Sequence, residues 1–181
     1  MTGPTGPQGT TGPTGAKPAG QLFLSAAGGW PSTTNGCEGP TKKEYGTNHV
    51  DIYHLAFDAA ADEFAQWTVV MPSDWDGGTI TAVFYWTYET GSAGQTVKFY
   101  IQGRSYANDD ALDQAFGTAV GVSDTAIAAN DLHVSASTAA VTIAGAGASE
   151  LVQFRVYRDV SEDDLAGDAL LLGVMITFGR S

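Results

Sequence analysis

A tryptophan between two aspartates is the part of the sequence best suited to contact a ligand. Trp75 lies in a turn-rich stretch, with Asp74 and Asp76 on either side. An indole ring can stack on the flat face of a sugar while carboxylates accept hydrogen bonds from the sugar hydroxyls. The alternative is that the ring folds back over its own hairpin. Tyr106 is a second aromatic residue in a loop-like context and a further candidate for ligand binding.

Patterns that indicate an enzyme are missing from the sequence. It contains no Gly-x-Ser-x-Gly, His-Glu-x-x-His or phosphate-loop pattern. Paired aspartates could act as the acid and base of a glycosidase, but carboxylates of this kind are common, and the chain lacks the internal repeats of β-helical polysaccharide-degrading enzymes. We therefore predict no catalytic residues, no cofactor and a non-enzymatic role.

Residues with metal-binding side chains do not form a convincing site. If residues 51–57 form a strand, alternation places His49 and Asp51 on one face and His54 on the other. The acidic loops around residues 74–76, 109–113 and 162–168 do not match the twelve-residue calcium loop, and aspartate also serves in turns and helix caps. We predict no metal site, and calcium in the acidic loops stays open as an alternative.

The charge balance excludes two classes of partner. The 181 residues include 8 Lys and Arg against 20 Asp and Glu, a formal net charge of −12. Nucleic acids and anionic membranes bind clustered basic residues, so neither is an expected partner. No apolar run of about 18 residues could span a membrane, and the first residues lack the basic start and apolar stretch of a secretion signal. We expect assembly in a cytoplasm and contact with neutral glycans or with protein surfaces.

Cys37 is the single cysteine, and it lies in a loop rich in Gly and Pro. One cysteine cannot form an intrachain disulfide, so the fold must be held by its own core or by oligomerisation. We expect a buried, unreactive thiol.

The first residues contain a strict three-residue repeat. Glycine stands at Gly3, Gly6, Gly9, Gly12 and Gly15, and four of the seven prolines lie in the same stretch. In a collagen triple helix every third residue must be glycine, because only glycine fits at the axis that three chains share. The alternative is a flexible Pro- and Gly-rich linker. We predict a collagen-like stalk over residues 1–20, about 45 Å long in its repeat, and a homotrimer of chains.

Residues 21–181 read as one all-β domain. Apolar and polar residues alternate over 79–88, 97–102 and 152–157, and weaker strand patterns cover 51–57, 64–71, 132–136, 139–144 and 170–178. Short helices are expected at 108–116 and 161–166. Seven or eight strands separated by turn signals predict a two-sheet, jelly-roll-like β-sandwich.

The last strand is apolar on both faces. Strict alternation puts Leu170, Leu172, Val174, Ile176 and Phe178 on one face, and Leu171 and Met175 on the other. Two interpretations are open. The strand is central and its second face is covered by loops, or that second face packs against the axis of a trimer.

A collagen-like run that leads directly into an all-β head resembles the collagen-repeat fibre and spike proteins of bacteriophages. It is more distantly similar to the C1q and tumour-necrosis-factor jelly rolls, which trimerise behind stalks. The stretch from Trp67 to Gly78 is also similar to phage fibre heads. This resemblance implies a homotrimer and a place in the virion, and it transfers no site residues.

The sequence therefore predicts a trimeric, non-enzymatic virion fibre or spike of a bacteriophage. It would be attached to other capsid or tail proteins, be assembled in the host cytoplasm, and bind the host surface, with a glycan as the expected ligand. The alternatives are a capsid decoration or cement trimer at threefold positions, a bacterial C1q-like surface protein and a carbohydrate-active enzyme.

Overall fold

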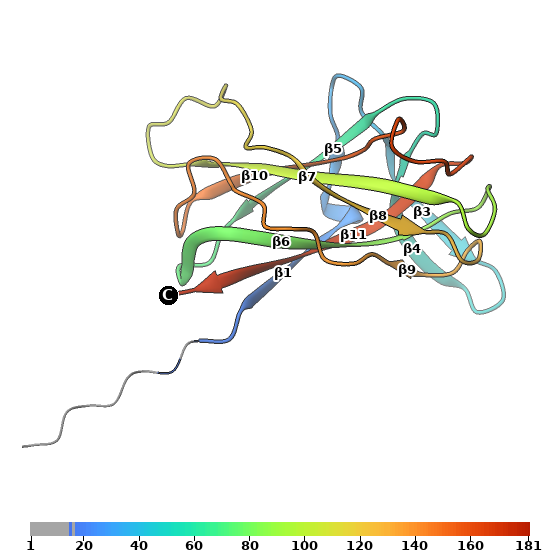
Figure 1. The fold of residues 1–181 in the computed structure, drawn as a ribbon, viewed down its shortest axis with the longest axis horizontal. Helices are drawn as coiled ribbons and strands as arrows, with labels where there is room; N and C mark the ends of the chain where they lie inside the picture. The colour runs from blue at the N-terminus through green and yellow to red at the C-terminus, as the bar shows by residue number, and fades with distance from the viewer. Residues whose placement is uncertain (1–14, 16) are drawn as a thin grey trace, which may run out of the picture.

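The chain folds into two stacked antiparallel β-sheets, as Figure 1 shows. The structure is a computed structural model, and it describes Gly15 and residues 17–181. The strands are β1 (Gly20–Ser25), β2 (Trp30–Pro31), β3 (Glu38–Tyr45), β4 (Val50–Phe57), β5 (Glu63–Val70), β6 (Trp75–Thr87), β7 (Thr96–Tyr106), β8 (Val120–Thr125), β9 (His133–Val134), β10 (Leu151–Arg158) and β11 (Ala169–Arg180). The one helical turn in this part of the chain is the 3-10 turn η1 (Ala26–Gly28), and no helix there is long and apolar enough to cross a membrane.

The two sheets take strands from both halves of the chain. The first sheet has the order β3-β4-β11-β6-β9, and β1 also pairs with β11. The second sheet has the order β2-β5-β10-β7-β8. In Figure 1, β5, β10 and β7 form one layer, and β1, β11 and β6 lie in the layer beneath it. The predicted all-β, jelly-roll-like sandwich is therefore confirmed.

The core lies between the sheets and follows the alternation of the sequence. The inward positions of β6, β7 and β10 are all buried: Ile80, Ala82, Phe84, Trp86, Val97, Phe99, Ile101, Val152, Phe154 and Val156. Phe99 stacks on Phe84, with ring centroids 5.2 Å apart, and meets Phe57 edge to face at 5.8 Å. Burying these side chains supplies most of the stabilisation, at about 1.5–3 kcal/mol each.

Several strand predictions need correction. The strand expected at 132–136 shrinks to β9, and 139–144 forms only isolated bridges, at Val141 and Ala144. Four strands, β1, β2, β3 and β8, were not predicted. β3 is polar and contains Pro40, a residue that sheets accept at an edge, where β3 lies. β8 contains Gly121 and Asp124, residue types that are depleted in strands, and it is held by its pairing with β7 and by Val120 and Val122 against the core.

The two predicted helices are wrong. Residues 108–116 form a loop in which Asp109 has a φ of +74°, outside the helical region, and the Tyr106 hydroxyl donates to the Leu112 carbonyl at 2.9 Å. Residues 161–166 are also irregular, because their carboxylates bind elsewhere. Asp164 accepts a hydrogen bond from the Thr96 N–H, and Asp163 pairs with Arg158. Aspartates that bind backbone groups in this way compete with helix formation.

A bulge in β11 changes the expected assignment of its two faces. The register against β6 shifts between Leu171 and Gly173. As a result Leu171 joins Val174, Ile176 and Phe178 in the core, while Leu170 and Met175 lie outside the core cluster. Strict alternation had placed Leu170 and Leu171 the other way round, because it takes no account of a bulge.

The N-terminal repeat falls largely outside the described residues. Gly3, Gly6, Gly9 and Gly12 lie there, so the stalk and the trimer stay predictions. Gly15 is exposed, and β1 begins only five residues later, at Gly20. The head therefore begins immediately after the repeat, next to β11.

Cys37 should react slowly with thiol reagents in the folded protein. Its side chain is 4% exposed, and burial, followed by the charge of Glu63, raises the pKa of the thiol from 9.0 to about 12. At a pH below both pKa values, the thiolate fraction of the buried thiol is therefore about a thousandfold lower than that of an unburied cysteine. Labelling with a disulfide reagent at pH 8 should therefore be complete in urea and negligible in buffer. Rapid labelling of the native protein would contradict this burial.

Candidate functional site

The structure places Trp75 in the core. A turn precedes β6, in which the Trp75 N–H donates to the Pro72 carbonyl at 3.1 Å, and the ring is 1% exposed. A ring without a free face cannot stack on a sugar, so the proposed stacking role is ruled out. The ring belongs instead to the hydrophobic core cluster of the sandwich.

Asp74 and Asp76 have local structural contacts. One Asp74 carboxylate oxygen lies 3.5 Å from Nε of Arg180, and Asp76 accepts a hydrogen bond from the Gly78 N–H at 2.8 Å. Both flank the start of β6 in the first sheet, whereas Tyr106 ends β7 in the second. The four predicted ligand-binding residues therefore do not form one site around the indole.

The residues considered as metal ligands are separated. His49 lies in the β3–β4 turn beside Glu44, and Asp51 pairs with Lys42 at 2.8 Å. His54 lines a pocket at β3, β4 and the start of β11, away from both of these residues. Among Gly15 and residues 17–181, no three His, Cys, Asp or Glu side chains are arranged to hold a metal ion.

The outer face of the second sheet carries the features expected of a ligand surface. Outward positions on its three central strands alternate with the buried ones. We call this surface the amide-aromatic face, and it consists of Phe64, Gln66, Thr68, Tyr100, Gln102, Tyr106, Gln153, Arg155 and Tyr157. Aromatic rings, amides and a guanidinium are thus presented together by rigid strands.

One end of the amide-aromatic face is a row of three rings. The register places Tyr157 opposite both Phe64 and Tyr100. Tyr100 and Tyr157 stack with centroids 5.0 Å apart and planes 5° apart, and Phe64 lies 5.0 Å from Tyr157. The Tyr100 hydroxyl donates to Glu162 at 2.9 Å, and this bond is the main reason that the pKa of Tyr100 rises to about 12.

Arg155 lies at the middle of the face between two aromatic rings. Its guanidinium carbon is 4.9 Å from the Phe64 centroid and 4.5 Å from that of Phe116, a residue of the loop between β7 and β8. With the Gln102 amide oxygen turned toward it, that oxygen accepts from Nη2 and Nε of Arg155 at 2.7 and 2.8 Å. Burial lowers the pKa of this guanidinium. Arg155 thus anchors the loop against the sheet.

Beyond Arg155 the face opens into a groove of about 440 Å³. Its floor is a hydrogen-bonded chain, in which Thr68 donates to Gln153 at 2.5 Å and Gln153 donates to Gln66 at 2.9 Å. The wall is the loop between β7 and β8, which contributes Leu112, Asp113, Gln114 and Phe116, and Tyr106 also lines the groove. The amides and hydroxyl of the floor can bind the hydroxyls of a sugar, and the apolar side chains of the wall, Leu112 and Phe116, can contact its C–H faces.

Of the sequence-based candidates, only Tyr106 lies in this groove. The polar residues of its floor were recognisable as outward-facing positions in the strands at 64–71 and 152–157. Nothing in the sequence showed that those two strands are neighbours, or that the loop carrying Phe116 folds over them.

Comparison with known protein families and with curated protein sequences finds no match. Among solved structures, the chain is similar to a non-crystalline cellulose specific carbohydrate-binding module, CBM28, with a TM-score of 0.51 and 15% identity over 83% of this chain and 87% of that one. A xylan-binding module, CBM15, aligns at a TM-score of 0.48 and 13% identity, over 91% of this chain and 99% of that one. CBM35 from Cellvibrio japonicus Abf62 aligns at a TM-score of 0.47 and 12% identity, over 90% of this chain and 99% of that one. At this identity, the likeness to CBM28 establishes a shared β-sandwich fold.

Proposed function

We propose that this protein is the glycan-binding head of a trimeric, stalked bacteriophage fibre or spike. The observation that carries the glycan part is the groove on the amide-aromatic face, where the chain of Thr68, Gln153 and Gln66 forms the floor beside a wall that includes Leu112 and Phe116. The cellulose-specific module CBM28, whose fold this chain shares, is a carbohydrate-binding module, which supports the same ligand class.

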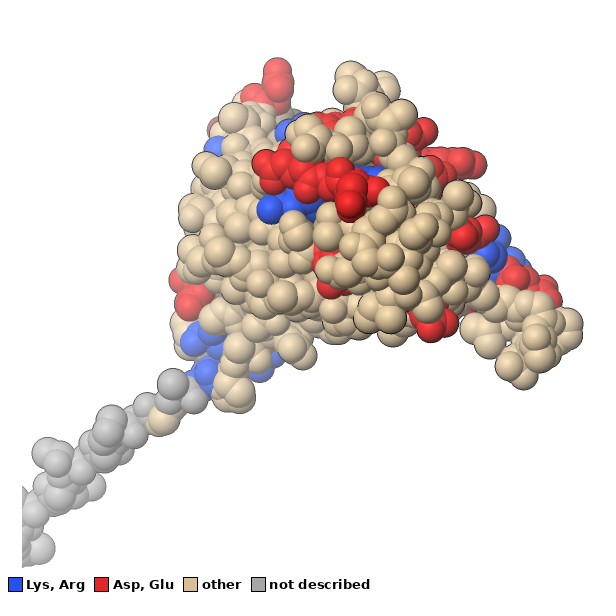
Figure 2. All heavy atoms as spheres, turned by 45° about the vertical axis from the view of Figure 1, so that its right-hand side comes forward, with Lys and Arg blue, Asp and Glu red and all other residues tan. Residues whose placement is uncertain are grey.

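The charge distribution favours a neutral glycan. The chain carries a net charge of −12, and Figure 2 shows acidic side chains in several groups on one face of the molecule. Such a surface repels anionic polysaccharides, and the guanidinium of Arg155 is already held by Gln102 and two rings. Hydroxyl groups are the expected partners of the free amide and hydroxyl positions.

Trimerisation is proposed on the repeat and on an apolar surface that begins next to it. Outward residues of β1, β11, β6 and β9 lie in register on the first sheet, and we define them as the apolar face: Phe23, Met175, Val83, Tyr85 and Val134. Phe23 is 46% and Val134 is 48% exposed. Three copies joined by a stalk would cover this face and present three grooves, and the resulting avidity offsets weak binding at each groove.

Groove variants should weaken binding to polysaccharide. We expect Tyr106→Ala and Gln153→Ala each to lower affinity about tenfold, because each removes a wall or a hydrogen-bonding group at the ligand. Affinity electrophoresis in gels containing soluble cellulose derivatives, xylan or host-envelope glycans measures this. Tyr53→Ala is the matched control, because Tyr53 is also a solvent-accessible tyrosine, 45% exposed, but belongs to the first sheet.

Three results would contradict the proposal. Binding that is unchanged in both groove variants would remove the groove as the site. Release of reducing ends from a bound polysaccharide would make the protein an enzyme. Labelling of purified phage particles with an antibody to residues 21–181 tests the virion role, and unlabelled particles would reject it.

A further inference from the structure

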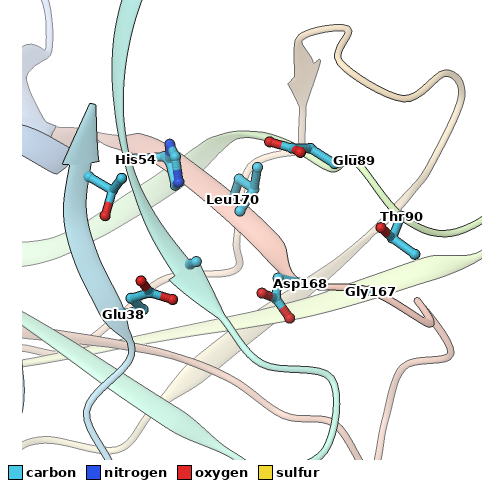
Figure 3. Close-up of a pocket in the computed structure, with 9 residues that line it drawn as sticks. Glu38, His54, Glu89, Thr90, Gly167, Asp168 and Leu170 are labelled. Carbon is cyan, nitrogen blue, oxygen red and sulfur yellow. The ribbon is translucent and has the colours of Figure 1, made fainter. Parts of the chain in front are cut away.

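A second pocket lies on the other sheet, away from the groove. It has a volume of about 420 Å³, within the range of small-molecule sites, and lies where β3, β4 and the start of β11 meet the turn after β6. Figure 3 shows His54 and Glu89 on one side of Leu170, and Glu38 and Asp168 on the other. The register explains this convergence, because Glu38 pairs with Ala56 and Ala56 pairs with Leu170.

The pocket carries negative charge that is only partly balanced. Glu89 contacts the ammonium of Lys43, whereas Glu38 and Asp168 form no ion pair with any residue of the described chain. Burial, followed by the charge of Asp58, raises the pKa of Asp168; Arg158 opposes this, and Glu38 and Glu89 add to it. A bound cation would relieve this repulsion.

His54 provides an independent sign of a missing partner. Its side chain is 9% exposed and lines the pocket, yet neither ring nitrogen forms a hydrogen bond with any residue that the structure describes. Burial is the main cause that lowers the pKa of His54, which keeps the imidazole neutral near pH 7. Because these nitrogens are not paired within the described chain, they can form a hydrogen bond with a hydroxyl group of a ligand in the pocket.

The shape of the pocket indicates a polyatomic ligand. The acidic side chains of the described residues are not arranged as a metal site, so a bare ion would not be held. Leu170 and Ala56 supply an apolar floor, and Thr41 and Thr90 contribute hydroxyls. A ligand that matches all three features has a positive charge, several hydroxyls and one C–H face.

We propose that this pocket binds a sugar that carries a free primary ammonium group. The ammonium lies between Glu38 and Asp168, the sugar hydroxyls bond to His54 and Thr41, and the C–H face of the ring rests on Leu170. This site is separate from the groove on the amide-aromatic face and does not depend on the function proposed for that groove.

The test compares two sugars that differ in charge. Glucosamine and N-acetylglucosamine are titrated into the full-length protein, and binding is followed by NMR chemical shifts of the backbone amides. We expect glucosamine to bind at least about tenfold more tightly, because acetylation removes the charge, and to weaken as salt screens the carboxylates. The shifts should map to β3, β4 and the start of β11.

Variants locate the site. Glu38→Gln and Asp168→Asn should each weaken glucosamine binding about tenfold, and His54→Phe should weaken it without removing the preference for the charged sugar. Glu44→Gln is the matched control, because Glu44 lies on the same strand but outside the pocket. Tyr106→Ala should leave glucosamine binding unchanged, which separates this site from the groove.

Three results would overturn the proposal. These are equal affinity for the two sugars, no saturable binding of glucosamine up to about 100 mM, and full binding in the Glu38→Gln, Asp168→Asn double variant. Binding of lysine or of calcium in place of glucosamine would show a cation site without sugar recognition and would also reject it.

Discussion

Replacing Arg158 with methionine should lower the free energy of unfolding by about 3–5 kcal/mol. Arg158 is 0% exposed, and its Nε and Nη2 each donate to Asp163 at 2.8 Å. Its other donors reach the carbonyls of Phe57, Gly167 and Leu165 at 3.1, 2.8 and 2.6 Å. The substitution leaves a carboxylate and several carbonyls buried without partners, which costs more than the original ion pair contributes.

Urea unfolding at one fixed protein concentration measures this loss. Arg180→Met is the matched control: Arg180 makes one ion pair, 3.5 Å from Asp74, and its side chain is 37% exposed, so we expect a change of about 0–1 kcal/mol. Adding Asp163→Leu to Arg158→Met should recover part of the stability, because it removes the buried Asp163 carboxylate that has lost its ion-pair partner. A loss below about 1 kcal/mol for Arg158→Met would show that water reaches these groups.

The intact protein should have a native mass three times the chain mass of 18.8 kDa, and Phe23→Arg should reduce it to that of a monomer. Phe23 lies on the apolar face, 46% exposed and edge to face with Tyr85 at 5.7 Å. In a single chain an arginine there is solvated at little cost. In a trimer it places charges at an apolar contact, where desolvation is expensive.

Native mass spectrometry and sedimentation distinguish the outcomes. Val70→Arg serves as the control, because Val70 is 62% exposed on the second sheet and should leave the mass unchanged. A monomeric wild-type protein would reject the trimer altogether. A trimeric Phe23→Arg would reject the apolar face as the interface and leave the repeat as the element that joins the chains.

The strongest strand predictions succeeded where burial and local pattern agree. In the 79–88 and 152–157 segments every second residue is apolar, and those residues form the core between the sheets. Prediction failed where a local signal competes with a distant contact. The aspartates of 161–166 are typical of a helix start. In the structure, however, Asp163 forms an ion pair with Arg158, and Asp164 accepts a hydrogen bond from Thr96, which lies 68 residues away.

The candidate site shows the same division. The sequence predicted an exposed Trp75 because its neighbours favour turns. In the structure the turn ends before Trp75, and the ring is buried in the core. Tyr106 was recognised as a candidate from its own context. Its partners Gln66 and Gln153 come from strands 87 residues apart that meet only through sheet pairing. A single sequence carries no record of which strands are neighbours.

By itself, the sequence determined the class of this protein: an acidic all-β chain with a glycine repeat before its head and a single unpaired cysteine. These features depend on composition and on local periodicity, which act within a few residues. Only the tertiary structure decided which outward side chains meet, where β11 bulges, and that Glu38, His54 and Asp168 surround one pocket. Those contacts join segments that lie far apart in the sequence, and they form because the two sheets must bury their apolar faces together.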